Sequence, residues 1–506
     1  MKVLLANPVY RNEINENEEQ FYIRAGSRWP FSIVKQKSKK SLYMPFPFYL
    51  AYTAALLERE GNVEVFVEDS IALNDAESLF LEKVFALRPD IMLFETATGC
   101  IRHDVDMATR IKAQIPEIKI CMAGFHATAL PKETISLAPG VIDFILLREY
   151  EFNFSALVRA LRDQVDISSI PGIAYVKNHE LVLQESTGVI DINMLPFPAR
   201  HLFPSNKIPD IDVYWDSFCQ YKPAVQMHGS RGCPFRCNFC VWNQVMYCNA
   251  AYRSRDVGLI CNEIEEVIAK YGAREIYFDD DTFTGNKKHV MQFCDEMIRR
   301  DLNKRVYWSA MADFMITDEE MLVKMREAGC IGLKFGVESG SDEVLKRICK
   351  PINRSKLVEN CRIAARLGLK THATFCFGLS GETRQTMEET MQLAMSIDSD
   401  TAQFSIATPF PGTAFYDELK KEGRLMSQNW EDYDGNNQSV VRYCDMDQKD
   451  VVAFYQSAMK RWLRSKLTNP RWFLRQFRLI LKVMQGQGIA GVIEKIRVMW
   501  RYVLQS

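Results

Sequence analysis

Three cysteines in one short loop are the residues of this sequence best suited to metal chemistry. Cys233, Cys237 and Cys240 are separated by four and three positions, in a segment that also contains glycine and proline. Thiolates at such spacings can fold around one metal centre, and both zinc ions and iron–sulfur clusters take thiolate ligands. An iron–sulfur cluster normally has four of these ligands, so three would leave one iron open to another molecule.

The surroundings of the loop favour iron–sulfur chemistry without excluding zinc. Arg231 and Arg236 flank the loop, and their charges suit an anionic cluster. Cys248 could complete a structural zinc site instead. The chain has 14 cysteines, and its first residues resemble no secretion signal. We therefore expect reduced thiols in a cytoplasm, with the isolated cysteines buried as small apolar residues.

Three later segments place polar residues or glycines directly after apolar runs that predict strands. They lie at residues 277–284, 332–340 and 377–383. Their most distinctive residues are Asp279, Asp280, Asp281, Glu338, Ser339, Gly378 and Gly381. Glycines let a backbone approach a ligand closely, although a tight turn alone would also use them. A solvated turn could explain each segment separately; their order behind the cysteine loop is more informative.

Taken together, the loop and these segments resemble the radical S-adenosylmethionine (SAM) superfamily. The resemblance includes the C-x3-C-x2-C spacing and the aromatic Phe239 before the last cysteine. It implies a 4Fe-4S cluster on the three cysteines, whose open iron chelates SAM, and reductive cleavage of SAM to a 5′-deoxyadenosyl radical. It also implies a SAM site that includes Phe239, Asp279, Asp280, Glu338, Ser339, Gly378 and Gly381. Residues 308–314, where relatives often carry an arginine, have none.

The elements that must position these residues predict an α/β chain of four parts. Residues 1–165 alternate strands and helices, which predicts a doubly wound parallel sheet. Residues 166–225 are rich in proline and predict a linker with a hairpin near 172–183. Six strand–helix units over residues 226–425 predict a partial (β/α)6 barrel, because a full barrel needs eight. Residues 426–506 predict a helical C-terminal extension.

The first part resembles the cobalamin-binding domain of one branch of the superfamily. Residues 124–128 and Pro131 match its G-x-H-A-T-x-x-P stretch, and residues 148–151 occupy the place of its G-E-G-E stretch. The resemblance implies cobalamin at the carboxyl ends of the strands, where such sheets bind ligands. The residues implied are Thr96, Thr98, Gly124, His126, Thr128, Glu149 and Glu151. Arg148 and Tyr150 replace two glycines of the branch, and their bulk could narrow the pocket.

These resemblances predict a cobalamin-dependent radical SAM enzyme that methylates an unactivated carbon of a small-molecule or lipid substrate. The alternative is a cyclase-like or lipid-processing radical SAM enzyme without methyl transfer, which a weak W-x-x-Y-D-G likeness at residues 430–435 favours. An iron–sulfur redox sensor or binding protein is the alternative of another class. Either enzyme needs an external electron donor such as flavodoxin or ferredoxin.

Charge and hydropathy narrow the partners further. A formal net charge of −1 gives no reason to expect nucleic acid, and no run of 18 apolar residues predicts a spanning helix. Near the end, Arg471, Arg475, Arg478 and Lys482 share one helical face, opposite an apolar face that includes Phe477. Either the apolar face caps the barrel, or the helix lies on a membrane surface. We expect a cytoplasmic protein, with peripheral contact at the inner membrane face as the alternative, and leave the oligomeric state open.

Overall fold

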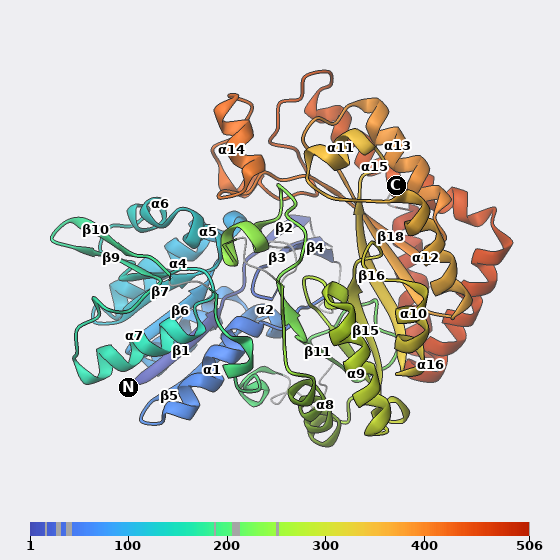
Figure 1. Ribbon diagram of the computed structural model, residues 1–506. Helices are drawn as coiled ribbons and strands as arrows, with labels where there is room; N and C mark the ends of the chain where they lie inside the picture. The colour runs from blue at the N-terminus through green and yellow to red at the C-terminus, as the bar shows by residue number, and fades with distance from the viewer. Residues whose placement is uncertain are drawn as a thin grey trace.

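Short apolar strands followed by amphipathic helices build two parallel sheets that lie side by side (Figure 1). The computed structural model describes residues 1–15, 18–26, 32–36, 43–186, 189–204, 213–248 and 252–504. Within them the first sheet belongs to the N-terminal domain and the second to the barrel domain. The predicted α/β class, with its two parallel sheets and helical C-terminus, is confirmed.

The N-terminal sheet has the strand order β10-β9-β8-β7-β6-β1-β5. Its five parallel strands are β1 (Lys2–Asn7), β5 (Glu64–Asp69), β6 (Ile91–Glu95), β7 (Lys119–Ala123) and β8 (Phe144–Leu146). The chain order reverses at β1, between β5 and β6, which is the switch point where such sheets bind ligands beyond the carboxyl ends. The predicted hairpin forms as β9 (Ile173–Lys177) and β10 (Glu180–Gln184), and it extends this sheet antiparallel to β8.

Helices cover the N-terminal sheet on both faces. The longer ones are α1 (Phe48–Glu60), α3 (Glu77–Leu87), α4 (Ile101–Gln114) and α7 (Glu151–Asp163), and the shorter ones are α2 (Ser70–Leu73), α5 (Phe125–Ala129) and α6 (Pro131–Ser136). A small antiparallel sheet of β2 (Arg11–Asn15), β3 (Glu18–Ile23) and β4 (Ser32–Gln36) was not among the predicted elements. Its polar sequence shows no strong alternation, so pattern alone does not reveal it.

The barrel sheet contains six parallel strands in chain order. They are β11 (Ala224–Met227), β14 (Glu275–Phe278), β15 (Tyr307–Ala312), β16 (Cys330–Glu338), β17 (Lys370–Phe377) and β18 (Thr401–Ile406). This is the predicted partial barrel. Between β11 and β14 the chain adds a two-stranded ribbon, β12 (Ser230–Arg231) and β13 (Arg253–Ser254).

Capping residues fix where the barrel helices begin. A side chain before each of five helices accepts a hydrogen bond from a backbone N–H of the first turn, which has no partner within the helix. These capping residues are Asp256, Asn286, Asp318, Asn353 and Thr383. The helices that follow them are α8 (Val257–Tyr271), α9 (Lys287–Arg299), α10 (Glu319–Glu327), α12 (Arg354–Arg366) and α13 (Arg384–Ser396). The short helix α11 (Asp342–Arg347) follows β16.

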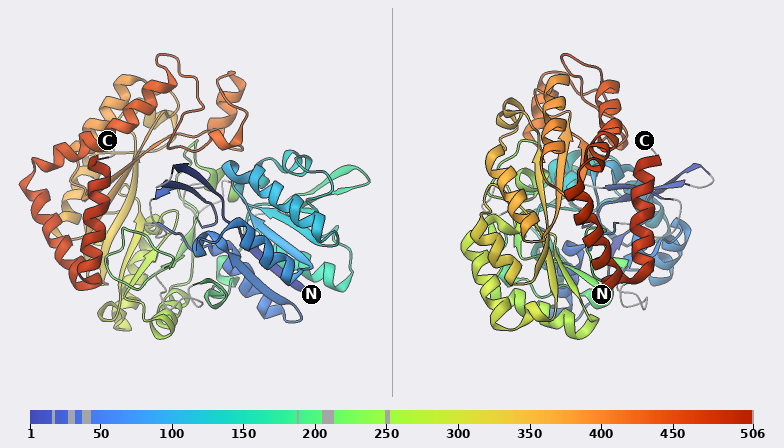
Figure 2. Two further views of the ribbon diagram at one scale, coloured as in Figure 1. Left: turned by 180° about the vertical axis from the view of Figure 1, so that it is seen from behind. Right: turned by 90° about the vertical axis from the view of Figure 1, so that its right-hand side faces the viewer.

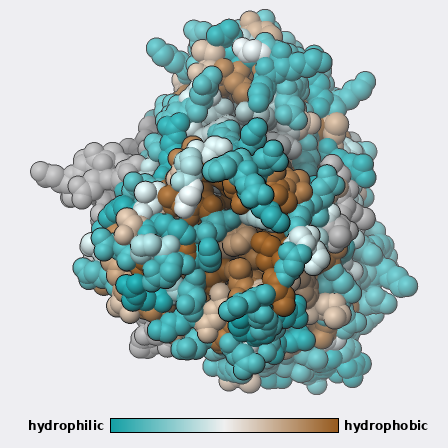
Figure 3. Space-filling view, turned by 90° about the vertical axis from the view of Figure 1, so that its left-hand side faces the viewer, coloured by the Kyte–Doolittle hydropathy of each residue, from teal (hydrophilic) through white to brown (hydrophobic). Residues whose placement is uncertain are grey.

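Three helices complete the chain: α14 (Ala414–Lys421), α15 (Gln448–Leu467) and α16 (Pro470–Leu504). Figure 2 shows α16 on the outside of the barrel domain, on the side away from the N-terminal domain. The opposite face is largely hydrophilic, with apolar side chains gathered in a hollow near its centre (Figure 3). No helix in the described part of the chain is both long and apolar enough to cross a membrane.

Candidate cluster and cofactor site

The cysteine loop follows β12 and is shaped by side chains of the segment after it. Cys237 is buried, while Cys233 and Cys240 are partly exposed. Asn243 Nδ2 donates to the carbonyl oxygen of Cys233 at 3.1 Å, and Gln244 Nε2 donates to that of Cys237 at 2.9 Å. These bonds hold the loop open around its three thiols. The described residues contain no group of three His, Cys, Asp or Glu side chains that converges on a single metal ion.

The charges around the thiols show that they share one neighbourhood. Burial raises the pKa of Cys233 to about 12 and also raises that of Cys237, and the neighbouring thiols raise both further. The ammonium group of Lys350 acts in the opposite direction on both. Thiolates in such a place need positive charge, which iron would supply. The donor set, three thiols beside one cation, therefore fits an iron–sulfur cluster.

Lys350 is the charged group that sequence patterns did not single out. Its Nζ lies 3.1 Å from Asp313 Oδ2, and the two side chains are 10% and 4% exposed. Burial alone would lower the pKa of Lys350, but Asp313, Cys237 and Glu338 raise it well above its usual value. A permanently charged ammonium therefore faces the thiols. Asp313 lies in the stretch that lacks the expected arginine, and Lys350 reaches it from 37 residues further along the chain.

Glu338 adopts a strained backbone at the end of β16. Its φ is 67°, and the register with β17 shifts between Gly336 and Glu338. A Cβ at Gly336 would lie 2.1 Å from Glu338 Oε1, so a larger residue there would require this carboxylate to move. Burial raises the pKa of Glu338, and Lys350 opposes that rise. Strain of this kind is retained where a side chain must point in one direction, here toward the cluster region.

The three aspartates after β14 make two kinds of contact, with the backbone of the cysteine loop and with a small pocket. Asp280 accepts from the backbone N–H of Gly229 at 2.8 Å, and Asp281 accepts from that of Gly232 at 2.8 Å. Both therefore anchor the start of the cysteine loop. Asp279 and Asp281 line a small pocket with an empty volume of about 350 Å³, open solvent included. The other residues that line it are Gly26, Phe48, Tyr49, His228, Ser230, Arg231, Trp242 and Tyr247.

The remaining residues predicted for SAM lie in tight backbone packing. Ser339 Oγ is 3.1 Å from Thr390 Oγ1 on α13, and it is fully buried. Gly378 has a φ of 82° beside Tyr443, and Gly381 has a φ of 75° beside the Arg347 side chain. Phe239 packs, partly buried, on the barrel core. In the same turn as the two glycines, burial raises the pKa of Glu382 to about 8, and its carboxylate accepts from two backbone N–H groups.

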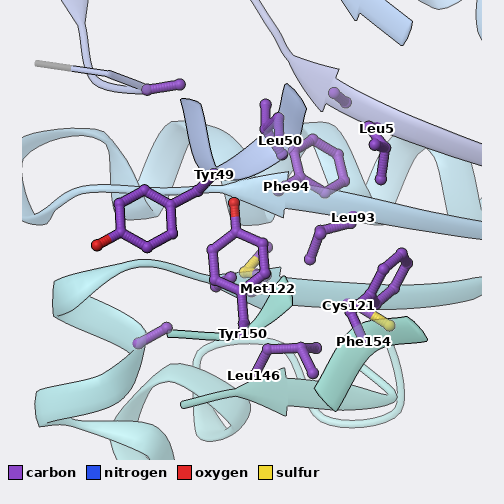
Figure 4. Packing of buried hydrophobic residues seen from close by; sticks show 14 of the residues in the cluster. Leu5, Tyr49, Leu50, Leu93, Phe94, Cys121, Met122, Leu146, Tyr150 and Phe154 are labelled. Atoms are coloured by element: carbon purple, nitrogen blue, oxygen red, sulfur yellow. The ribbon is translucent and has the colours of Figure 1, made fainter. Parts of the chain in front are cut away.

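At the carboxyl edge of the N-terminal sheet, Thr96 and Gly124 line a second pocket. A Cβ at Gly124, whose φ is 106°, would meet the Thr96 carbonyl oxygen at 2.2 Å, so this glycine is required by strand packing. Tyr150 donates to Glu95 Oε2 at 2.6 Å, and burial raises the pKa of Glu95 to about 7. Figure 4 shows Tyr150 beside Tyr49 at the edge of the core.

His126 lies beside this pocket and is fully buried. Its Nδ1 is 3.2 Å from Thr98 Oγ1, and its ring meets Trp430 edge-on at 5.2 Å between centroids. Burial lowers the pKa of His126 to about 3, so the ring is neutral. Thr128 Oγ1 accepts from the backbone N–H of Arg148 at 2.9 Å. His126 Nε2 and Thr96 Oγ1, both buried at this edge, have no hydrogen-bond partner among the described residues.

Glu149 and Glu151 bind the barrel domain instead of facing a pocket. Arg231 donates to Glu149 at 2.9 Å and to Glu151 at 2.6 Å, and Arg253 donates to Glu149 at 2.8 Å. We call these four residues the interdomain ion cluster. Arg231 is 2% exposed and stacks on the Tyr49 ring at 4.5 Å. Its charge is thus matched by carboxylates of the other domain.

Comparisons with known proteins agree with this geometry. The sequence profile of the radical SAM superfamily matches residues 227–394. An uncharacterized methyltransferase of Pyrococcus horikoshii is 30% identical over 389 residues, which are 76% of this chain and 81% of that protein. An anaerobic magnesium-protoporphyrin IX monomethyl ester cyclase of Cereibacter sphaeroides is 26% identical over 390 residues. That alignment covers 74% of this chain but only 60% of the cyclase.

A solved structure shares the whole arrangement of domains. The cobalamin-dependent SAM radical enzyme OxsB, with aqua-cobalamin and SAM bound, aligns with 99% of this chain and 75% of its own. The TM-score is 0.67 and the sequence identity is 14%. At this identity the likeness establishes the fold, including the order of the sheet, the barrel and the C-terminal helices.

The interdomain ion cluster predicts a large effect on stability. Arg231→Met should lower the free energy of unfolding by about 3–5 kcal/mol, because it leaves the buried Glu151 without its counter-charge and Glu149 with Arg253 alone. Urea denaturation of the anaerobically purified protein measures this change. Arg162→Met, which breaks an exposed pair with Asp163, is the control and should change it by no more than about 0.5 kcal/mol. Equal denaturation midpoints for the two variants would contradict the prediction.

Proposed function

Because this chain belongs to the radical SAM superfamily, we propose that it is a cobalamin-dependent enzyme that methylates an unactivated carbon of a small-molecule or lipid substrate. One observation carries the proposal: the cysteine loop is tied directly to the carboxyl edge of the doubly wound sheet. Arg231, two residues before Cys233, is held by carboxylates that follow β8. The cluster site and the ligand edge of the sheet therefore face each other.

The residues that would hold the cluster and SAM can be named. Cys233, Cys237 and Cys240 supply three thiolates, and the fourth iron is left for SAM. When bound, the cluster supplies the electron that cleaves SAM. Lys350, kept charged by Asp313, is the cation available to the SAM carboxylate, and Glu338 is the carboxylate available to its ribose or amino group. Asp280 and Asp281 fix the loop backbone.

The carboxyl edge of the N-terminal sheet offers polar groups that could bind cobalamin. Thr96 Oγ1 and His126 Nε2 are buried without a hydrogen-bond partner in the described part of the chain, and a corrin carries amide groups that could satisfy both. When bound, cobalamin would carry the methyl group toward the substrate. Tyr150 lines this pocket, and its hydroxyl is directed to Glu95. Glu149 and Glu151 are already paired and would act by joining the domains.

Two alternatives make different predictions for the same protein. The similarity to the cyclase of Cereibacter sphaeroides favours the first alternative, ring closure without methyl transfer. Trp430 of the W-x-x-Y-D-G stretch packs edge-on against the His126 ring. A redox sensor would keep the cluster but would not cleave SAM. Methyl transfer is preferred because the relative from Pyrococcus horikoshii, of which 81% is aligned with this chain, is named as a methyltransferase.

We propose two partners as well. The reductive step requires an external electron donor, such as a flavodoxin or ferredoxin. The C-terminal helix α16 would give the protein a peripheral contact with a membrane. The small-molecule or lipid substrate would enter between the two domains, where the pockets lie.

Product analysis tests methyl transfer. Protein purified anaerobically with cobalamin supplied should contain about one cobalt and four iron atoms per chain. With a reductant it should form 5′-deoxyadenosine, and with substrate also S-adenosylhomocysteine. Cys237→Ala should abolish the cluster absorbance and 5′-deoxyadenosine, while the exposed Cys444→Ala leaves both unchanged. Cobalt-free protein that yields 5′-deoxyadenosine alone would support the cyclase-like alternative.

A substitution at Lys350 tests its proposed contact with the SAM carboxylate. Lys350→Met should weaken SAM binding roughly tenfold or more, because an ion pair in a buried site is lost. The affinity for decarboxylated SAM should stay within about twofold, since that ligand lacks the group that Lys350 binds. Equilibrium dialysis with both ligands measures this, and Lys346→Met on the exposed side of the same segment is the control. An equal loss for both ligands would show a general disruption of the site.

A further inference from the structure

The side of α16 that packs on the barrel combines polar groups with the buried apolar side chains of Trp472 and Val483. Arg475 bonds to Asp398 at 2.6 Å and to Asp400 at 2.9 Å, just before β18 begins. Trp472 Nε1 donates to the carbonyl oxygen of Asp400 at 3.1 Å, and Trp472 is 5% exposed. Further along, Gln487 Nε2 donates to the carbonyl oxygen of Gln220 at 2.9 Å, before β11. The helix thus lies across the amino ends of the barrel strands.

Its apolar side faces outward. Phe473, Leu474, Phe477, Ile480, Leu481 and Met484 are between 38% and 62% exposed, and we call these six residues the apolar face of α16. Of the 19 large apolar side chains exposed in the described residues, ten lie from Leu467 onward. Such a concentration marks a site of interaction on a monomer surface. The expectation that this face caps the barrel is wrong.

The reason for this inversion lies in the polar groups that the barrel presents. The amino ends of its strands offer the carboxylates of Asp398 and Asp400 and free carbonyl oxygens. These groups need donors when they are covered, because an unpaired buried carboxylate is costly. Arg475, Trp472 and Gln487 supply the donors. Packing the apolar face there would have removed the ion pairs that Arg475 makes with both carboxylates.

Basic side chains surround the apolar face. Arg464, Arg471 and Arg478 are exposed beside it, and no acidic residue occurs between residues 461 and 493. Two copies of this chain joined by the same face would bring these charges together, which disfavours self-association. A surface that combines negative charge with an apolar interior satisfies both features. Anionic lipid bilayers have this combination.

We propose that the apolar face of α16 docks on an anionic lipid bilayer, with Arg471 and Arg478 at the headgroups. The inference builds on the peripheral contact proposed above and is independent of methyl transfer. The docked face lies at the amino ends of the barrel strands, whereas the cysteine loop follows their carboxyl side. The N-terminal domain lies away from α16 (Figure 2), so docking leaves the pockets between the domains uncovered.

Flotation with vesicles tests the proposal on the full chain. The holoprotein should float with phosphatidylcholine/phosphatidylglycerol vesicles and not with phosphatidylcholine alone. Leu474→Gln/Phe477→Ser should reduce the partition coefficient on anionic vesicles roughly tenfold or more, through lost apolar contact. Arg471→Gln/Arg478→Gln should reduce it by a similar factor, through lost attraction to the headgroups. Point substitutions at exposed positions avoid the unfolding that removal of α16, with its buried Trp472, would cause.

The control is Val165→Gln/Val176→Gln, which alters apolar side chains of similar exposure, 57% and 50%, on the N-terminal domain. It should float like the natural protein. Absence of flotation, or flotation equal in all variants, would overturn the proposal. So would a dimer in light scattering that Leu474→Gln/Phe477→Ser dissolves, because the face would then bind a second copy. Cluster absorbance and 5′-deoxyadenosine formation should be the same in all variants, so failure here leaves the enzymatic proposal unaffected.

Discussion

The contact between Arg231 and the two glutamates after β8 is the constraint on which the rest of the structure depends. Three charged side chains are buried at the junction of two domains, and each is almost fully removed from water. Burial alone would lower the pKa of Arg231, but Glu151 and Glu149 raise it well above its usual value. A buried charge of this kind is tolerated only when its partners are in place. The N-terminal domain therefore determines the position of the backbone that leads into the cysteine loop.

The same requirement for matched charge shapes the cluster region. Asp313, Glu338 and the thiols of Cys233 and Cys237 act on one ammonium group, that of Lys350. Carboxylates alone would oppose an anionic cluster, and a lysine alone would be costly to bury. Their combination keeps Lys350 charged, and the Glu338 carboxylate lies where a Cβ at Gly336 would meet it. These charged residues are far apart in the sequence, and only folding brings them together beside the cysteine loop.

Matched polar groups also decide the orientation of α16. Helical periodicity separates its basic and apolar faces but does not say which one is buried. Apolar burial usually decides, at about 25 cal/mol per Å² of area removed from water. Here the buried Asp400 and the partly buried Asp398 pair with Arg475, so the side with Arg475 and Trp472 packs inward. The result is an apolar surface that water does not favour and that a lipid surface can cover.

The sequence by itself determined the two parallel sheets, the six-stranded barrel and the cysteine loop, because strand periodicity and ligand spacing are local properties of the chain. It did not reveal the small sheet of β2, β3 and β4, whose pattern is weak. Nor could it give the partners of Glu149, Glu151 and Lys350, or the inversion of α16. These depend on pairs separated by 37 to 82 residues and on how much water each pair loses. Only the tertiary structure brings such charges together, because an ion pair is worth little until both partners are buried at bonding distance.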